Sequence, residues 1–556
     1  MLKDEQLYIA HSANGNINMI GKMANRHGLI AGATGTGKTV TLQVLAETFS
    51  QAGVPCFMAD MKGDLSGISQ AGKLSGFIEK RMPEFGIENP QFAGCPTRFF
   101  DVFGEQGFPM RATVSAMGPQ LLARLMQLTE VQAGVLNALF RIADDNNLLL
   151  IDLKDLKLML NFVGQNAAQF TTEYGNIAPA SVGAIQRAVL QIESEGGDKF
   201  FGEPAFDVQD LFAVENGRGV MNVLAADKLM LNPKLYSTYL LWLMTELYAT
   251  LPEVGDLDLP KFVFFFDEAH MLFDGTSKAL VDKIEQVIRL IRSKGVGIYF
   301  ITQVPSDVPV NVLAQLSNRV QHALRAYTPQ DQKAVRAAAQ TFRANPAFKT
   351  EDAILDLGTG EALVSFLDEK GAPSVVERAK ILFPLSQIGA ITPGQRFDIQ
   401  AAAPQKLKDY EKFFDRESAY EVLTEAAAKA EKEAEEERKA LEKQKEKEAK
   451  AKEKEKQSKK TTKKSGVGRT ILGTMIAAAA TSFARSAGTR IAKNIGGSST
   501  KKSSSKSSSS KSSTAKKTTT KKSGSTLGSA AKKATKTAVN TATRKVTTEI
   551  LKSIFS

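Results

Sequence analysis

One stretch near the N-terminus, GLIAGATGTGKTVTLQ (residues 28–43), constrains the fold of this chain more than any other. An apolar run leads into a glycine loop that opens a helix, and the loop matches the pattern G-x-x-x-x-G-K-[ST]. In such loops the glycines let backbone N–H groups turn inward around phosphates, and the helix points its N-terminus at them. The residues expected to bind the nucleotide are Gly32, Ala33, Thr34, Gly35, Thr36, Gly37, Lys38 and Thr39.

Two of these side chains have separate predicted roles. Lys38 is expected to pair with the β- and γ-phosphates of ATP, and the hydroxyl of Thr39 is expected to bind Mg²⁺. ATP and Mg²⁺ are therefore the predicted ligands. Because a loop of this kind fits kinases, GTPases and motors alike, other residues must define the reaction.

A second apolar run, FVFFFDEAH (residues 262–270), ends in two acids. Asp267 stands at the end of this predicted buried strand, where a carboxylate can hold Mg²⁺ through water. Glu268 follows it and can orient and deprotonate an attacking water, which favours hydrolysis over transfer to another acceptor. The sequence therefore predicts a hydrolytic site with Asp267 at the metal and Glu268 as the base.

Polar residues also follow two further predicted strands. Gln303 ends GIYFITQ, and the carboxyl ends of parallel strands open onto the same crevice, so we expect Gln303 to face the γ-phosphate near Glu268. Asp60, Lys62 and Asp64 follow the strand at 54–60, where they either line the crevice or form a polar turn.

The order of the predicted elements indicates an α/β fold with a mainly parallel central sheet covered on both faces. Residues 1–400 are predicted to form the ATPase domain, with a helical insertion at about 105–215. Residues 401–460 are expected to form a charged helix and linker, rich in Ala, Glu and Lys. Residues 461–556 are expected to be a basic, low-complexity, mostly disordered tail with two weakly helical segments.

Charge is distributed unevenly between these parts. Residues 461–556 contain 20 Lys and Arg and one acidic residue, whereas the first 460 residues contain 52 basic and 59 acidic residues. Any general attraction to nucleic acid is therefore expected in the tail. The same segment is alternatively a docking element for a protein partner or an anionic membrane surface.

Cysteine usage and hydropathy bear on the compartment. Cys56 and Cys95 are the only cysteines of the 556-residue chain, so a disulfide framework is excluded and a reduced, cytoplasmic protein is expected. The N-terminus has no apolar core of a signal peptide, and the apolar run at 471–480 is too short for a transmembrane segment.

Taken as a set, GATGTGKT, FFFDEAH, MADMKGDLSG and ITQ after RLIRSKGVG resemble the HerA/FtsK-like P-loop ATPases, specifically the HerA C-terminal-like branch, over roughly residues 20–390. The resemblance implies a RecA-like motor that forms a homo-oligomeric ring, typically a hexamer. Archetypal HerA proteins carry a β-barrel ahead of the ATPase domain, and we do not expect one in the residues ahead of Gly32.

Rings of this kind complete each site with an arginine from the neighbouring subunit. By its position after the glutamine strand, the family's arginine falls best on Arg319, in LSNRVQHAL, with Arg325, Arg289 and Arg292 as alternatives.

Two functions remain open at this point. The best-known relatives move along or unwind double-stranded DNA, so the first is a DNA translocase or helicase-like ATPase. The second is an ATPase that powers a protein- or membrane-associated machine of the secretion or conjugation type.

Overall fold

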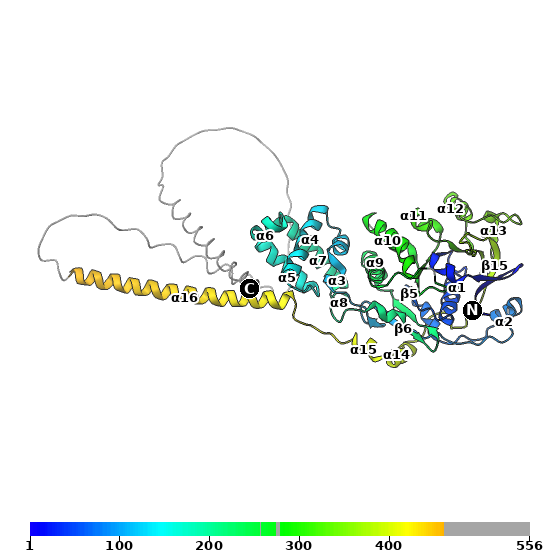
Figure 1. The fold of residues 1–556 in the computed structure, drawn as a ribbon, viewed down its shortest axis with the longest axis horizontal. Helices are drawn as coiled ribbons and strands as arrows, with labels where there is room; N and C mark the ends of the chain where they lie inside the picture. Colours follow the sequence, from blue (N-terminus) through cyan, green and yellow to red (C-terminus); the bar gives the residue numbers. More distant parts are fainter. Residues whose placement is uncertain (256, 274–277, 461–556) are drawn as a thin grey trace, which may run out of the picture. The chain divides into compact units, whose positions relative to one another are not determined.

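One large sheet organises the first part of the chain in a computed structural model that describes residues 1–255, 257–273 and 278–460 (Figure 1). The chain divides into two units, Met1–Val422 and Leu423–Ser556. The expectations for the basic tail at 461–556 lie outside the described residues. The sheet has thirteen strands among the described residues, and all belong to the first unit.

The strands occur in an order that differs from their order along the chain. In space they are β1 (Leu2–Lys3), β2 (Gln6–Ser12), β15 (Glu377–Ile381), β14 (Glu361–Ser365), β13 (Asn318–Gln321), β4 (Gly28–Ala31), β12 (Val296–Thr302), β11 (Phe262–Phe266), β5 (Cys56–Asp60), β10 (Met221–Ala225), β6 (Thr97–Asp101) and β7 (Phe108–Pro109), with β3 (Gly15–Met19) paired to β2. From β13 to β7 the strands are parallel, and from β14 to β1 they pair antiparallel. The predicted mainly parallel sheet is confirmed.

The register brings the carboxyl ends of the central strands to one edge. Ala31 of β4 lies opposite Thr302 of β12, and Phe266 of β11 lies between Phe300 of β12 and Ala59 of β5. The residue that follows each strand therefore emerges at this edge, which is where ligands bind in open α/β sheets.

Helices cover both faces of the sheet. On one face, α1 (Lys38–Gln51) buries Leu42, Leu45 and Phe49 in a core shared with β4, β5, β11 and β12. On the other face lie α9 (Pro233–Thr250) and α10 (Lys278–Ile291), which contact each other. Since β11 is buried on both faces, every residue of FVFFF is apolar.

The remaining helices are shorter or belong to the connections. Outside the connection from β7 to β10 and the C-terminal segment they are α2 (Gly76–Arg81), α11 (Val310–Leu313), α12 (Pro329–Ala339) and α13 (Thr350–Asp356). A small separate ribbon pairs β8 (Val214–Glu215) with β9 (Arg218–Gly219).

A helical insertion fills the connection from β7 to β10, as the apolar spacing there predicts. Its helices are α3 (Val114–Leu125), α4 (Glu130–Asp145), α5 (Leu153–Gln165), α6 (Ala167–Tyr174), α7 (Pro179–Ile192) and the short α8 (Asp198–Phe200). Thr129 and Gln132 form a capping box at the start of α4, and Asp152 and Asp155 form one at the start of α5. These caps start α4 and α5 at defined residues.

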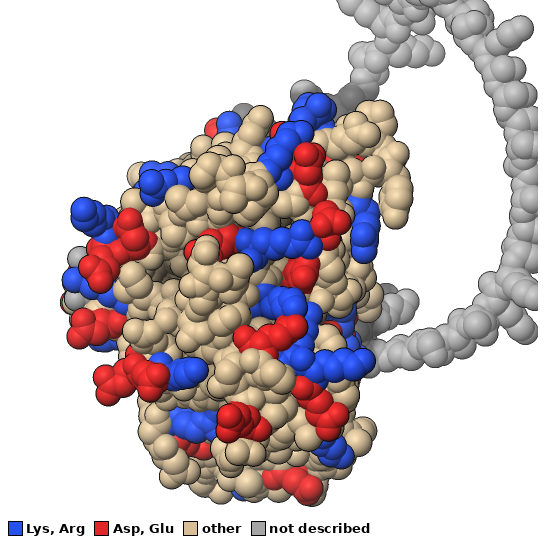
Figure 2. All heavy atoms as spheres, turned by 90° about the vertical axis from the view of Figure 1, so that its right-hand side faces the viewer, with Lys and Arg blue, Asp and Glu red and all other residues tan. Residues whose placement is uncertain are grey.

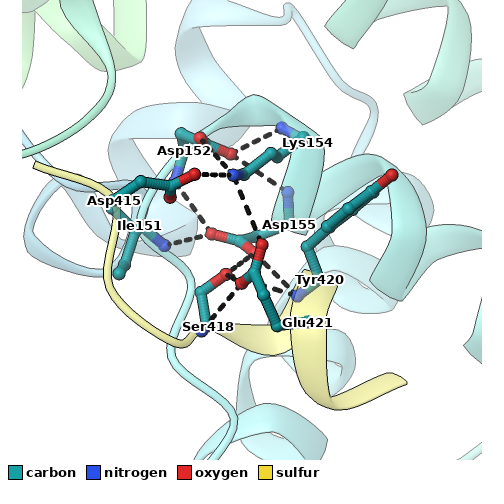
Figure 3. A network of polar contacts seen from close by, with 8 residues as sticks. All are labelled: Ile151, Asp152, Lys154, Asp155, Asp415, Ser418, Tyr420 and Glu421. Atoms are coloured by element: carbon teal, nitrogen blue, oxygen red, sulfur yellow. Dashed lines mark hydrogen bonds and ion pairs between the residues drawn. The ribbon is translucent and has the colours of Figure 1, made fainter. Parts of the chain in front are cut away.

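After α14 (Pro393–Ala402) and α15 (Gln405–Asp409) the chain returns to the insertion, at the N-terminus of α5 (Figure 3). The buried carboxylate of Asp155 accepts hydrogen bonds from the backbone N–H groups of Ile151 (2.8 Å) and Asp152 (3.1 Å). It also accepts from Ser418 Oγ (2.5 Å) and from the backbone N–H of Tyr420 (2.9 Å). One carboxylate therefore caps α5 and fixes the first turn of α16 (Ala419–Lys460) on the insertion.

Beside Asp155, the ammonium of Lys154 lies 2.7 Å from Asp415 and 3.4 Å from Glu421. Most of α16 belongs to the second unit, and its exposed surface carries i,i+4 pairs such as Glu435–Lys439 at 3.0 Å. None of the described helices is both long enough and apolar enough to cross a bilayer.

Candidate active site

The glycine loop between β4 and α1 has a backbone that other residues adopt only with strain. Gly32, Gly35 and Gly37 have φ values of +156°, +78° and +117°. A Cβ on Gly32 would lie 2.5 Å from the Cβ of His322, so the loop also packs too closely there for a side chain. The backbone conformation therefore favours glycine at all three positions, and at Gly32 the packing requires it as well.

Hydrogen bonds fasten this loop to the neighbouring strand ends. The backbone N–H of Gly32 donates to the carbonyls of Thr302 (3.2 Å) and Gln303 (3.1 Å), and that of Ala33 donates to Ala323 (2.8 Å). Thr34 and Gly35 are exposed, so the tip of the loop is open to a ligand. With α1 beginning at Lys38, the N–H groups at its N-terminus are directed to the same place.

Beneath the loop lies a histidine for which the sequence predicts no role. His322 is buried, and its Nε2 lies 2.7 Å from the hydroxyl of Thr41 in α1. Its Nδ1 lies 2.9 Å from the carbonyl of Glu361 at the start of β14. Burial, with Lys38 nearby, lowers the pKa of His322 to about 4, so the ring is neutral near pH 7. His322 links β13, α1 and β14 under the phosphate loop.

Lys38 lies at the centre of the expected phosphate site. Its Nζ donates to the carbonyl of Ala33 at 3.2 Å. Burial lowers the pKa of Lys38, against the opposing influence of the negative charges of Glu268 and Asp267. The lysine of the loop and the two acids after β11 are therefore close enough to interact electrostatically, and their roles in catalysis stay predictions.

The two acids differ in their surroundings. Asp267 is buried, and burial together with the charge of Glu268 raises the pKa of Asp267 to about 6. Glu268 has left-handed backbone angles, φ 47° and ψ 50°, which cost a non-glycine residue about 1–3 kcal/mol. Such strain persists where the surrounding structure imposes it, and it aims the Glu268 side chain into the edge where the strands end.

Glu268 has a cationic partner that comes from β5. The Nζ of Lys62 lies 2.5 Å from Glu268 Oε1. Burial raises the pKa of Glu268, but the hydrogen bond and charge of Lys62, with His270 and Lys38, bring it below its ordinary value. The sequence left two interpretations for the segment with Asp60 and Lys62: a polar turn or a wall of the site. Asp60 Oδ1 accepts from the N–H of Gly63 (2.7 Å) in a turn, and Lys62 contacts Glu268.

Gln303 occupies the end of β12 beside the loop, with an exposed side chain. Asp307 fixes this strand end, because its Oδ2 accepts from Thr302 Oγ1 (2.6 Å) and from the N–H of Val304 (3.1 Å). The backbone of Gln303 contacts Gly32, and its role as a phosphate sensor stays a prediction.

Arg319 makes its contacts inside its own chain. The guanidinium donates from Nε to Leu316 O (3.0 Å), from Nη1 to Thr341 O (3.0 Å) and from Nη2 to Leu313 O (3.2 Å). Burial lowers its pKa. Arg325, the first alternative, is exposed after β13. The assignment of a trans arginine stays a prediction.

The residues at this edge fit a nucleoside triphosphate with Mg²⁺. The glycine cradle has no room for a side chain at Gly32, and Lys38 supplies a cation. Thr39 and the buried carboxylate of Asp267 are hard oxygen donors of the kind that Mg²⁺ prefers. The buried Oε2 of Glu268 accepts no hydrogen bond from the described residues and lies 3.5 Å from His270 Nδ1.

Several solved structures resemble this chain in overall path. The bacterial conjugative coupling protein TrwBdeltaN70, in an unbound form, is 14% identical over 71% of this chain and 92% of its own, with a TM-score of 0.46. TrwB in complex with ADP and Mg²⁺ is 15% identical over 68% and 89%, with a TM-score of 0.46. VirB4 of Thermoanaerobacter pseudethanolicus is 14% identical over 70% and 97%, with a TM-score of 0.44. No curated protein sequence matches the chain.

The match to a protein family is more extensive. The family model described as "Helicase HerA-like C-terminal" matches residues 5–503, which include the glycine loop, both acids after β11 and the helical insertion. The fold agrees, since a mostly parallel sheet carries the loop after β4 and the acids after β11, with β12 between these two strands, as in RecA-like P-loop ATPases. The chain therefore belongs to the family of HerA-like helicase C-terminal proteins.

Proposed function

We propose that this protein hydrolyses ATP at the edge of the sheet where β4, β11 and β12 end. The observation that carries the proposal is the convergence of Lys38, Asp267 and Glu268 at that edge, with Glu268 held in a strained backbone conformation. Lys38 and the N-terminus of α1 bind the β- and γ-phosphates. Thr39 and Asp267 hold Mg²⁺, which when bound neutralises phosphate charge.

Glu268 acts as the base. Its carboxylate accepts a proton from water while the water oxygen attacks the γ-phosphorus. The bond from the γ-phosphorus to the β,γ-bridging oxygen breaks, and ADP and inorganic phosphate leave. We expect Gln303, which follows β12, to contact the γ-phosphate and to transmit its presence to that strand.

We further infer that the energy drives movement along DNA by a ring of identical subunits, with a hexamer as the expected form. Membership of the HerA-like family supports this assignment. The basic segment at 461–556 supports it as well, because clustered lysines attract phosphate without regard to sequence.

The charges on the surface of the first unit help to decide which part of the chain would contact DNA. Figure 2 shows one face, and on it basic and acidic side chains are interspersed. On the antiparallel side of the sheet, Arg378 pairs with Glu361 (2.7 Å) and Asp356 (2.8 Å), and Lys380 pairs with Glu84 (2.8 Å). Lysines and arginines that are paired in this way attract a polyanion weakly, so we assign the main non-specific DNA attraction to the tail.

The test is ATP turnover with and without duplex DNA, for the full chain and for a version that ends at Lys460. We expect DNA to stimulate the full chain, and we expect added salt to abolish the stimulation. The shortened version is expected to need more DNA for the same effect. The Lys38→Ala variant of each form is the negative control, because it lacks the lysine that binds the phosphates.

The alternative is an ATPase that powers a protein- or membrane-associated machine. The acidic balance of residues 1–460, with 52 basic and 59 acidic residues, favours it over DNA binding by the body of the protein. In that case turnover does not respond to single- or double-stranded nucleic acid at any salt concentration, and the tail binds a protein partner.

A further inference from the structure

The ion pair between Lys62 and Glu268 occupies one oxygen, Oε1, of the carboxylate that the proposed reaction needs. At 2.5 Å the contact is a charge-assisted hydrogen bond, of the strong class. A carboxylate oxygen that accepts a hydrogen bond from an ammonium is less available to accept a proton from water. The residue expected to activate water is therefore already engaged by a side chain of its own chain.

The two partners come from different strands and differ in exposure. The side chain of Lys62 is 55% exposed, whereas that of Glu268 is 12% exposed. Lys62 thus reaches from the surface to a largely buried carboxylate. Because an ion pair with one exposed partner contributes little to stability, this contact can be exchanged without unfolding its surroundings.

The turn that carries Lys62 is fastened to its own strand. Asp60 Oδ1 accepts from the N–H of Gly63 (2.7 Å), and Ser66 Oγ donates to the carbonyl of Gly63 (2.7 Å). Gly63 has a φ of +78°, which favours glycine. These hydrogen bonds hold the turn that follows β5. The side chain of Lys62 extends from this turn and contacts Glu268.

We propose that Lys62 restrains Glu268 and keeps basal ATP hydrolysis slow until the lysine is drawn away from the carboxylate. Lys62 is in this account a positioning residue, which acts through Glu268. The inference rests on the proposed role of Glu268 as the base. The opposite role is a lysine that binds the γ-phosphate and assists the reaction, and the two roles give opposite results when the charge is removed.

The experiment compares ATP turnover of the full chain with that of the Lys62→Met and Lys62→Arg variants. Methionine keeps the length of the stem but removes the charge, so kcat is expected to rise about three- to tenfold with KM for ATP unchanged. Arginine can re-form the ion pair, and its kcat is expected to stay within about twofold of wild type. Lys73→Met, which removes the charge of an exposed lysine outside the site, is the matched control.

Glu268→Gln and the double variant Lys62→Met with Glu268→Gln complete the set. We expect both to be equally slow, because the effect of Lys62 passes through Glu268. An unchanged or lower kcat in Lys62→Met, alongside an inactive Glu268→Gln, overturns the restraint and leaves the proposed function intact. Wild-type turnover in Glu268→Gln overturns both. A Lys62→Gln variant repeats the test should the methionine variant unfold at a lower temperature than wild type.

Discussion

At the scale of single residues, the site depends on side chains that position the phosphate loop as well as on those expected to touch ATP. His322 shows this most clearly, because its ring nitrogens lie within hydrogen-bonding distance of Thr41 in α1 and of the Glu361 carbonyl in β14. The Cβ of His322 packs against Gly32, and its ring packs against Gly37. A neutral histidine under the loop therefore holds three elements in register beneath the phosphates.

The buried state of His322 makes its contribution to stability depend on pH. Its folded pKa of about 4 lies below the ordinary value of about 6.5, so the unfolded chain takes up the proton first as the pH falls. The stability due to the neutral ring is present above pH 6.5 and is lost as the pH falls toward 4. We expect the difference in unfolding free energy between wild type and His322→Gln to shrink by about 2 kcal/mol from pH 7.5 to pH 5.

Denaturant unfolding at several pH values measures this difference. His27 is also buried, and burial lowers its pKa to about 4. Because His27 is present in both proteins, its contribution cancels in the difference between their unfolding free energies. A difference that stays constant across the range contradicts the assignment of a buried neutral ring to His322.

At the scale of elements, the start of α16 is held by the helical insertion through Asp155. This carboxylate accepts four hydrogen bonds, two from the N-terminus of α5 and two from Ser418 and Tyr420 (Figure 3). The chain thus links residues about 265 positions apart through one buried group. The place where the charged helix leaves the first unit is set by this contact.

Replacing Asp155 with asparagine should therefore weaken two elements together. The asparagine amide keeps one acceptor oxygen, but its NH₂ group faces N–H or O–H donors that bonded to the second carboxylate oxygen. We therefore expect the free energy of unfolding to fall by about 2–4 kcal/mol. We also expect faster hydrogen exchange and proteolysis at residues 411–422. The control is Asp144→Asn, an exposed carboxylate on α4. If residues 411–422 are equally protected from hydrogen exchange and proteolysis in the Asp155→Asn and Asp144→Asn variants, Asp155 does not hold the start of α16.

Much of this arrangement could be predicted from the sequence. Strands β4, β5, β11 and β12 were predictable because strands buried on both faces are continuously apolar and end in polar residues. The strands β1, β2 and β3 were not, since QLYIAHS and GNINM mix polar and apolar residues. Their pairing also depends on a distant segment, because β1 and β3 pair with β2, and β2 pairs with β15. Likewise the contact of Lys62 with Glu268 joins residues 206 positions apart, and local patterns carry no information about such pairs.

At the scale of the whole molecule, the proposal of a ring makes the site a shared one. An arginine from the neighbouring subunit would then be needed for each turnover. Arg319 uses its guanidinium on backbone carbonyls of its own chain, whereas Arg325 is exposed. Both residues are tested, because the side chain of an arginine can change conformation when a neighbouring subunit binds.

Mixed rings distinguish a trans arginine from a structural one. Arg319→Ala and Arg325→Ala subunits are each mixed with Lys38→Ala subunits, which keep the arginine and lack the phosphate ligand. We expect one of the two mixtures to regain part of the wild-type turnover. If neither mixture regains activity in rings shown to contain both kinds of subunit, the trans arginine is neither of these residues.

In the proposed reaction, Glu268 activates water at a site that Lys38 and Asp267 form around ATP. The most direct measurement sets ATP affinity beside single-turnover hydrolysis for Glu268→Gln and Lys38→Ala. We predict that Glu268→Gln binds ATP with an affinity within about threefold of wild type and hydrolyses it about 10²–10⁴ times more slowly, and that Lys38→Ala loses binding. Hydrolysis by Glu268→Gln at the wild-type rate would contradict the account.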